Sequence, residues 1–507
     1  MFRKSDYFNN SNFKCLMSNK INWSLSTIIL FLAFSGCKTT RQPEAIGVWN
    51  PTANGNLTIL ALNDMHASID NFPKLAAIVD SIRSIHPNLL LFSAGDNRTG
   101  NPVNDRYPRV SYPMMALMNN LRFDASAVGN HEFDGGVAGL RELIQNSTFR
   151  YLCANMDAPD SMRLHVIPYR FFERNGLRIG VLGLIQLGNQ GTPDCHPDNV
   201  RGISFSPAVK VIPEYLEWMR KQCDILILLT HYGHENDQKL AEQFPKADII
   251  IGGHSHTLVK TTELSNGVLV TQAGNLAKYL TEITVKVTNG KVTDKQSHLI
   301  DVRAASNKSQ SVQSLVDKFN DNEELNKILT VAEAPFTEKE ELGSLMADAL
   351  RVETGADIAL QNAGGVRFSE HPAGEFTMKD VLMLDPFANE MLMFNLTGEE
   401  INLLLASAAH TDEYGPSFVS GIRYKIWLDK NADAKRVEVF LPNGTPLDKA
   451  KTYRVAMSSY QASVAKYEHN DPGQPLFSNS ADLLANFLGK QKSLNYKGVK
   501  RVEIIRE

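Results

Sequence analysis

The sequence has 507 residues, of which 43% are hydrophobic, 21% charged and 8% aromatic. This is an ordinary globular composition, so it excludes wholesale disorder, collagen and coiled coil, and the length predicts more than one domain. Lysine and arginine number 52 against 56 aspartate and glutamate residues, for a formal net charge of −4. With no basic surplus, binding to a nucleic-acid polymer is disfavoured, although a small phosphate ester needs only a local positive site.

The N-terminus has the pattern of an export signal. Leu25–Phe34 is a mostly apolar run of ten residues, too short to span a bilayer but typical of a signal-peptide core. It ends in Phe34-Ser35-Gly36-Cys37, which resembles the bacterial lipobox, whose cysteine is acylated and becomes the mature N-terminus. We therefore expect a signal peptide over 1–37, with Met17 as an alternative start, and a polar linker over 38–56. The protein is expected to be exported, in the periplasm or at the cell surface, with a lipid anchor at Cys37.

Three cysteines follow this leader. Cys153, Cys195 and Cys223 allow at most one disulfide bond. Cys153 and Cys223 border apolar runs, so we expect them to be buried free thiols. Cys195 precedes His196 in a polar stretch, which is too little to predict a metal pair.

From Leu57 to about Ile300, short apolar runs alternate with helical stretches. The spacing predicts helices such as Phe72–His86 and Pro207–Gln222, and a hairpin over 281–293 that turns at Asn289-Gly290. Strands are predicted at 57–62, 89–94, 125–129, 178–184, 224–230, 247–251 and 268–272. This alternation predicts an α/β domain whose sheet faces are covered by helices.

The rest of the chain predicts a second domain. Residues 302–330 are polar and predict a helical connector between a first domain over 57–301 and a second over 331–507. The second domain has a mixed α+β pattern. Its helices are predicted near 341–354, 378–384, 397–408 and 480–490.

Polar side chains follow five of the predicted strands directly. They are Asp64 and His66 after the first strand, Asp96 after the second, Asn130, His131 and Asp134 after the third, His231 after 224–230, and His254 and His256 after 247–251. Residues at the carboxyl ends of strands converge on one crevice of an α/β sheet. One such residue alone is usually a turn or N-cap residue, but five strand ends rich in histidine indicate a metal site.

Seven of these side chains offer nitrogen or oxygen donors without a thiolate: Asp64, His66, Asp96, Asn130, His231, His254 and His256. Seven donors exceed what one transition metal takes, but suit two ions that share a bridging carboxylate. Such a pair stabilises the attacking and leaving oxygens of a phosphoryl displacement and makes hydroxide available at neutral pH. Imidazole and carboxylate ligands fit two divalent ions of zinc, manganese or iron rather than copper or calcium.

These motifs resemble a known family. The segments Gly129–Asp134 (GNHEFD) and Gly252–His256 (GGHSH) are similar to those of the calcineurin-type metallophosphoesterases, in particular the 5′-nucleotidase family, which includes UDP-sugar hydrolases. The resemblance implies a sandwich of two sheets flanked by helices, followed by an α+β substrate-binding domain.

The resemblance also implies a role for each site residue. Asp96 would bridge the two metals. Asp64, His66 and His256 would complete one metal site, and Asn130, His231 and His254 the other. His131 would act on the substrate phosphate or the leaving oxygen, with Asp134 holding its ring, a task suited to a group that titrates near neutral pH. Glu132 would have a supporting role at most, and His234 is the only other histidine of interest.

The second domain resembles the family's nucleotide-binding part. The loop Gln361–Arg367 (QNAGGVR) implies contacts to a nucleotide from Asn362, Gly364 and Arg367. Phe387 and Tyr460 fall where the family has two aromatic rings that stack on the base.

Two positions depart from the family pattern. Glu338 replaces the arginine that usually lies five residues before the glycine found here as Gly343. Val464–Tyr467 replaces a Gly-Gly-Asp-Gly loop whose aspartate binds ribose hydroxyls, and Lys466 cannot accept a hydrogen bond. Recognition of ribose is therefore an open question.

The leading hypothesis is metal-dependent hydrolysis of phosphate esters, with 5′-nucleotides cleaved to nucleoside and phosphate by a metal-activated water. On the same scaffold, the substrate could instead be a 2′,3′-cyclic nucleotide, a UDP-sugar or a dinucleotide pyrophosphate. A more distant relative acts on a sulfur-bound group, which the cysteine-poor loops do not support. From another class, a surface lipoprotein that only binds its ligand remains an alternative, against which the complete ligand set speaks.

Overall fold

The computed structural model describes residue 49 and residues 52–506, apart from 388, 412–414 and 432. The predicted signal peptide, the alternative start at Met17 and the expected lipid site at Cys37 lie outside the described residues. Among the residues described, no helix is long and apolar enough to cross a membrane.

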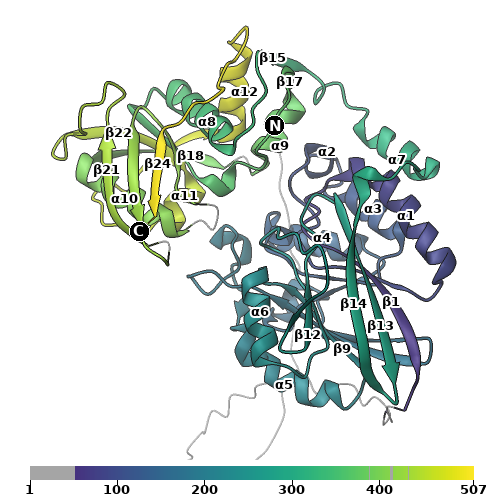
Figure 1. Cartoon of the computed structure of the whole chain (residues 1–507). Helices are drawn as coiled ribbons and strands as arrows, with labels where there is room; N and C mark the ends of the chain where they lie inside the picture. Colours follow the sequence, from purple (N-terminus) through teal and green to yellow (C-terminus); the bar gives the residue numbers. More distant parts are fainter. Residues whose placement is uncertain (1–48, 50–51, 388, 412–414, 432, 507) are drawn as a thin grey trace, which may run out of the picture. The chain divides into compact units, whose positions relative to one another are not determined.

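Two six-stranded sheets form the first part of the described chain (Figure 1). The first sheet joins four parallel strands to an antiparallel pair whose hairpin turns at Asn289-Gly290, where both residues have positive φ, as a two-residue hairpin turn requires. Across this sheet the strands are β14 (Lys291–Asp301), β13 (Tyr279–Thr288), β1 (Gly55–Leu62), β2 (Leu90–Ser93), β3 (Ala125–Ala127) and β4 (Arg150–Leu152).

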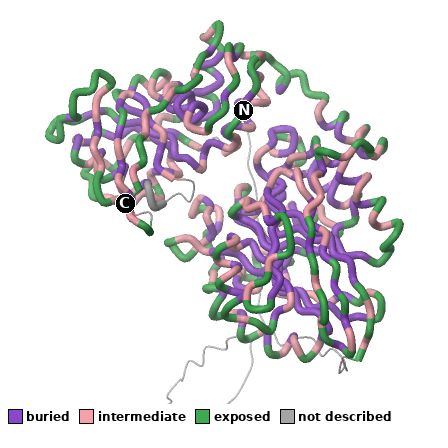
Figure 2. The backbone as a smooth tube through the Cα atoms, viewed as in Figure 1, coloured by how far each residue is buried: buried purple, intermediate pink, exposed green. Residues whose placement is uncertain are grey.

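The second sheet is parallel in its centre and antiparallel at both edges. Its strands are β11 (Glu263–Ser265), β12 (Val268–Thr271), β10 (Ile249–Ile251), β9 (Ile225–His231), β7 (Leu177–Ile185) and β6 (Tyr169–Arg174). The two sheets share one apolar core, in which Ile59 and Phe92 of the first sheet pack with Ile179 and Ile227 of the second, all fully buried. Figure 2 shows this core as buried strands inside the first part.

Helices cover the outer face of each sheet. The first sheet packs against α1 (Phe72–Ile85), α3 (Tyr112–Leu121) and α4 (Gly136–Asn146), and the second against α5 (Ala208–Arg220) and α6 (His234–Gln243). The amphipathic patterns place the apolar side of each helix on its sheet. The predicted α/β sandwich with helix-covered faces is thereby confirmed.

The second part of the chain has mixed sheets and helices, as predicted. A five-stranded sheet has the order β19 (Phe418–Ser420), β16 (Ile358–Gln361), β22 (Thr452–Ser458), β18 (Glu390–Thr397) and β23 (Gln474–Asn479). A three-stranded sheet has the order β21 (Ala434–Phe440), β20 (Arg423–Leu428) and β24 (Val502–Arg506). The helices are α8 (Lys339–Thr354), α9 (Met378–Leu384), α10 (Gly398–Thr411), α11 (Ser459–Val464) and α12 (Ser480–Gly489).

The segment between the two parts is only partly helical. Helix α7 covers Gln310–Asn320, but β15 begins at Ile328 and pairs with β17 (Gly374–Thr377). The prediction of a helical connector over 302–330 was therefore right only for its middle: residues 305–309 and 321–327 are not helical, and a strand begins at Ile328. The β-branched residues Ile328, Thr330 and Val331 favour a strand once a partner strand from a distant part of the sequence is available.

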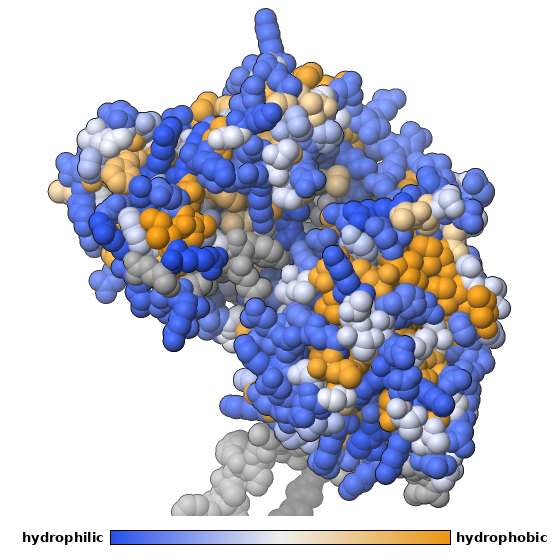
Figure 3. Space-filling model, in the orientation of Figure 1, coloured by the Kyte–Doolittle hydropathy of each residue, from blue (hydrophilic) through white to orange (hydrophobic). Residues whose placement is uncertain are grey.

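The surface and the cysteines agree with a globular protein. The face shown in Figure 3 is mostly hydrophilic, with separate apolar patches. Cys153, Cys195 and Cys223 are all buried free thiols, as expected for Cys153 and Cys223.

Candidate metal centre

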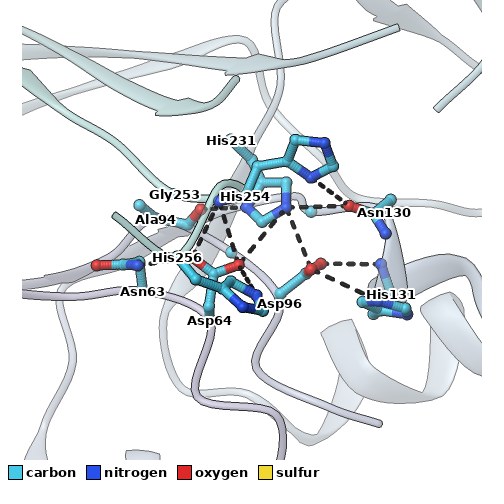
Figure 4. A network of polar contacts seen from close by, with 12 residues as sticks. Asn63, Asp64, Ala94, Asp96, Asn130, His131, His231, Gly253, His254 and His256 are labelled. Carbon is cyan, nitrogen blue, oxygen red and sulfur yellow. Dashed lines mark hydrogen bonds and ion pairs between the residues drawn. The ribbon is translucent and has the colours of Figure 1, made fainter. Parts of the chain in front are cut away.

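The structure brings all seven predicted metal ligands together. Figure 4 labels all of them except His66. His231 is the last residue of β9, and the other six lie on the loops that follow β1, β2, β3 and β10. These strands all end at the same side of the sandwich core. The donor atoms of Asp64, His66 and His256 lie within 4.8 Å of one another, and so do those of Asp96, His231 and His254. A third such group joins His66 and Asp96 with His131, so Asp96 and His66 each belong to two groups. The first two groups contain six of the seven residues that the sequence assigned to two metal ions.

The loops that carry these ligands have an unusual backbone. Five predicted ligands have positive φ: Asp64 (47°), His66 (45°), Asp96 (53°), His254 (82°) and His256 (55°). Left-handed conformations of residues other than glycine cost of order 1–3 kcal/mol each and cluster at functional sites. The fold therefore holds these five side chains in place at the expense of stability, which is expected of a binding site and not of ordinary turns.

Two glycines allow the loops to approach each other. A Cβ atom at Gly129 would overlap the Asp96 carboxylate, and a Cβ at Gly253 would lie 2.8 Å from the carbonyl oxygen of Ala94 and 2.9 Å from His231 Nδ1. Neither position has room for a side chain. This close approach explains why glycine precedes both histidine motifs.

Asp96 lies at the centre of the cluster. Its Oδ2 atom is 3.2 Å from His231 Nε2 and 3.9 Å from His131 Nε2, and its Oδ1 atom accepts a hydrogen bond of 2.8 Å from the backbone N–H of His131. Burial opposes its ionisation, but the neighbouring imidazoles outweigh burial and hold the pKa of Asp96 well below its ordinary value. A buried ionised carboxylate that is shared between two donor groups suits a bridging ligand.

Hydrogen bonds fix the ring orientation of two histidines. His231 Nδ1 lies 2.8 Å from the carbonyl oxygen of Ala94, and His66 Nδ1 lies 3.1 Å from that of Thr99. Since a carbonyl oxygen only accepts, both Nδ1 atoms donate, and the Nε2 atoms face the cluster as potential ligands. Burial and the positive charge of Arg367 hold the pKa of His66 well below its ordinary value, so its ring is neutral, as metal binding requires.

The remaining ligands are held in the same way. Asn130 Oδ1 lies 3.0 Å from both His231 Nε2 and His254 Nδ1, and its Nδ2 donates to the carbonyl oxygen of Asp194 at 3.1 Å. Asp64 Oδ2 accepts hydrogen bonds from Asn63 Nδ2 at 2.6 Å and from the backbone N–H of His254 at 2.9 Å. Oxygen and imidazole donors thus converge with their orientations set by the surrounding protein, which fits divalent cations of the zinc, manganese or iron type.

His131 and Asp134 lie beside this cluster as a hydrogen-bonded pair. His131 Nδ1 is 2.8 Å from Asp134 Oδ2, so the other nitrogen, Nε2, faces Asp96 and the cavity. Burial lowers the pKa of His131, but Asp134 and Asp96 outweigh this effect and raise it above its ordinary value. The ring can therefore carry a proton near neutral pH.

Glu132 contributes more than its position in the sequence indicated. Its buried carboxylate accepts hydrogen bonds from the backbone N–H groups of Asp96 (2.9 Å), Asn97 (2.8 Å) and Gly129 (2.6 Å). It thereby ties the loop after β2 to the loop after β3. His234 has no such role: its Nε2 lies 3.1 Å from Glu263 Oε1, and its backbone N–H donates to Ser255.

The cluster opens into a cavity of about 930 Å³ that both parts of the chain line. The predicted substrate-binding residues all line it: Asn362, Gly364, Arg367, Phe387 and Tyr460. Arg367 Nη2 lies 3.1 Å from His66 Nε2. The Phe387 ring stacks on that of His131, with ring centroids 5.5 Å apart and planes at 22°.

Other residues of the cavity were given no role in the site by the sequence analysis. Arg98, Gln186, Asp194 and Cys195 line it as well, and Asp194 Oδ2 lies 3.5 Å from His254 Nε2. Gln186 directly follows β7, so the strand-end signal that identified the histidines could have found it. Asp194 lies in an irregular loop, where no periodic pattern predicts which side chains face the cavity.

The two departures from the family pattern have different settings. Glu338 is the N-cap of α8 and forms an ion pair with Lys500 at 3.2 Å. Its side chain therefore caps a helix and takes part in a surface ion pair. Lys466 lines the cavity, and its backbone N–H donates to Ser407 Oγ at 2.8 Å. The open question of ribose recognition therefore concerns a residue that a ligand in the cavity can reach.

Comparisons with known proteins agree with this geometry. Residues 57–258 match the calcineurin-like phosphoesterase family, and residues 323–466 match the 5′-nucleotidase C-terminal domain. The chain is 28% identical to protein UshA of Yersinia enterocolitica, over 87% of this chain and 91% of the relative. It is 27% identical to a 5′-nucleotidase of Vibrio cholerae, over 87% and 90%.

A solved structure extends the similarity to the whole fold. The crystal structure of a 5′-nucleotidase precursor from Thermus thermophilus superposes with a TM-score of 0.80 at 25% identity, covering 89% of this chain and all of that one. The family matches account for both parts of the chain and contain the clustered aspartates and histidines. The chain therefore belongs to the calcineurin-like phosphoesterases that carry a 5′-nucleotidase C-terminal domain, and it is a metal-dependent phosphoric ester hydrolase.

Proposed function

We propose that this protein hydrolyses nucleoside 5′-monophosphates to nucleoside and phosphate. One observation carries the proposal: the buried aspartate–histidine cluster and the predicted nucleotide-binding residues line or border a single cavity. The relatives named 5′-nucleotidase support the same substrate class.

The ligand set would hold two divalent ions. Asp64, His66 and His256 would hold one, Asn130, His231 and His254 would hold the other, and Asp96 would contribute to both. Zinc, manganese and iron all suit these donors. When bound, such a pair would activate a water and stabilise charge on the phosphoryl oxygens.

The protein's own groups position the substrate and move protons. His131, held by Asp134, would donate its Nε2 proton to the leaving oxygen of the ester, a task worth about 10²–10⁴-fold in rate. Arg367 would donate from its guanidinium to the phosphoryl oxygens, since it already reaches His66 at the edge of the cluster. Asn362 and Gly364, which belong to the same loop and line the cavity, would contact the nucleotide beside Arg367.

The base would stack on Phe387 and Tyr460. Phe387 now packs against His131, and the guanidinium carbon of Arg367 lies 5.5 Å from its ring centroid. A stacked base would take the place of one of these neighbours. Lys466 offers no acceptor for ribose hydroxyls, which favours loose selection of the sugar and keeps cyclic nucleotides, UDP-sugars and dinucleotides as substrates to be tested.

We further propose that the enzyme works outside the cytoplasm as a lipoprotein. The apolar run Leu25–Phe34 and the following Cys37 support export and lipid attachment. Incorporation of labelled palmitate into the wild-type protein, and its loss in Cys37→Ser, is the expected result.

A substrate panel with metal analysis tests the enzymatic proposal. The protein from residue 39 onward would be loaded with manganese, zinc or iron and offered nucleoside 5′-monophosphates, 2′,3′-cyclic nucleotides, UDP-glucose and NAD, with phosphate release and nucleoside formation measured separately. The 5′-monophosphates should give the highest kcat/KM. A higher kcat/KM on another compound of the panel would identify that compound as the preferred substrate class instead. If a metal-loaded sample hydrolyses none of the compounds, a protein that only binds its ligand is favoured.

A further inference from the structure

Arg98 lies two residues after the central Asp96 and is not used by the hydrolysis described above. Only 5% of Arg98 is exposed, and its side chain lines the same cavity as His131 and Asp134. Its Nε and Nη1 atoms are buried without a hydrogen-bond partner, and no carboxylate among the described residues lies within ion-pair distance of it. A buried cation with unused donors is unusual, because native proteins satisfy such groups.

The guanidinium packs against the start of helix α4. A Cβ atom at Gly135 would lie 2.7 Å from Arg98 Nη1, and one at Gly139 would lie 3.0 Å from it. Gly135 is the N-cap of α4 and offers no side-chain cap. The first turn of a helix carries positive partial charge, so the fold places a cation where the local potential is already positive.

Two acidic side chains that line the same cavity, Asp105 and Asp134, form hydrogen bonds to other groups. Asp105 accepts hydrogen bonds from the backbone N–H groups of Thr99, Gly100 and Asn101 at 2.8–3.2 Å. Asp134 Oδ2 is bound to His131. Both acids share the neighbourhood of Arg98 without satisfying its donors, so the site still lacks an acceptor.

We propose that Arg98 and the N-terminus of α4 form an anion subsite that takes a phosphate-sized group in addition to the phosphoryl group at the metal centre. Guanidinium donors fork onto phosphate oxygens, and helix N-termini bind phosphate. The anion is either a second phosphate on the same substrate or a free phosphate. The first source would make doubly phosphorylated esters preferred substrates. The subsite proposal takes one element from the proposed function, namely that the first phosphoryl group binds at the metal centre.

Binding of non-hydrolysable compounds tests this subsite without any turnover. Alkane bisphosphonates with one to four methylene groups between the phosphonates would be titrated into the metal-loaded protein by calorimetry, beside alkyl monophosphonates of matched length. At least one bisphosphonate should bind tenfold or more tightly than its matched monophosphonate, and Arg98→Met should abolish that ratio. The exposed Arg106→Met, which removes the same charge outside the cavity, should preserve it.

Free phosphate is tested in the same protein. A free anion is identified as the ligand if the wild type binds a second equivalent of inorganic phosphate and Arg98→Met does not, while no bisphosphonate binds more tightly than its matched monophosphonate. If neither a bisphosphonate advantage nor a second phosphate is found, or if either survives in Arg98→Met, the subsite does not exist.

A second variant covers the case in which Arg98→Met does not fold. Gly139→Ala adds a methyl group against Arg98 Nη1 in a helix, where alanine is favoured over glycine. It should fold and still weaken binding of the second anion. Because no assay here involves nucleotide cleavage, failure of the nucleotidase proposal leaves these outcomes intact, and an active nucleotidase without the second anion site overturns this inference alone.

Discussion

The Glu132 carboxylate accepts the backbone N–H of Asp96 at 2.9 Å, which fixes the central carboxylate of the metal centre through its main chain. The other oxygen of Glu132 accepts the N–H of Asn97 at 2.8 Å. Every hydrogen-bond partner of this side chain is a backbone N–H donor. The loop that carries Asp96 therefore depends on a side chain in which both terminal oxygens accept hydrogen bonds.

Glu132→Gln should therefore damage the site although the shape of the side chain is kept. The amide must turn its NH₂ group toward at least one backbone N–H, which leaves buried donors facing each other. We expect a loss of about 1–3 kcal/mol in the free energy of unfolding, together with a lower metal content. Denaturant titration and elemental analysis measure both, with the exposed Glu214→Gln as the control. Unchanged metal content in Glu132→Gln would contradict this role.

Asp96 and His131 are neighbours with different expected roles, so their variants should separate. Asp96→Asn removes the charge that two donor groups share and should lower metal content and activity together. His131→Asn should keep the metals, because His131 belongs to neither predicted ligand set, while kcat falls by about 10²–10⁴-fold. Metal stoichiometry and kcat measured on both variants distinguish the two roles. A His131→Asn protein with a normal kcat would refute the role assigned to His131.

The positions of Asp64, Asp96, Asn130, His231 and His254 could be predicted because each lies at the end of an apolar strand or within three residues after it. Parallel strands end at one edge, so the strand pattern alone indicates that these residues meet. The burial of Arg98 could not be predicted in this way, because it depends on Gly135 and Gly139 of a helix that begins some forty residues later. The strand at Ile328 was missed for a related reason, since its partner β17 lies far along the chain.

Asp134 should set the pH range of the reaction. Burial lowers the pKa of His131, and the charges of Asp134 and Asp96 raise it to a value above the ordinary one. Asp134→Asn removes one raising charge, so His131 should lose its proton at a lower pH. Because the protonated ring is the proposed proton donor, the alkaline limb of the kcat profile should move to lower pH. The exposed Asp198→Asn should leave the limb in place, and an unmoved limb in Asp134→Asn would contradict the pairing.

Metal binding should release protons from His231. Burial disfavours its charged form, but Asp96 and Asp64 outweigh burial and raise the pKa of His231 to about 10 in the metal-free protein. At pH 7.5 this ring is therefore protonated, whereas a metal ligand must be neutral. The raised pKa also means that the metal-free protein should lose stability as the pH rises toward 10, since the folded state then gives up a proton that it holds more tightly than the unfolded chain.

Calorimetric titration of the metal-free protein with zinc or manganese, in buffers of different ionisation enthalpy, counts these protons. The wild type should release about one more proton than His231→Gln, because that variant lacks the titrating ring. His298→Gln changes an exposed histidine that pairs with Glu282 outside the cluster, so it should release as many protons as the wild type. Equal release from the wild type and His231→Gln would mean that the carboxylates do not hold a proton on His231. The His231 ring would then already be neutral before the metal binds.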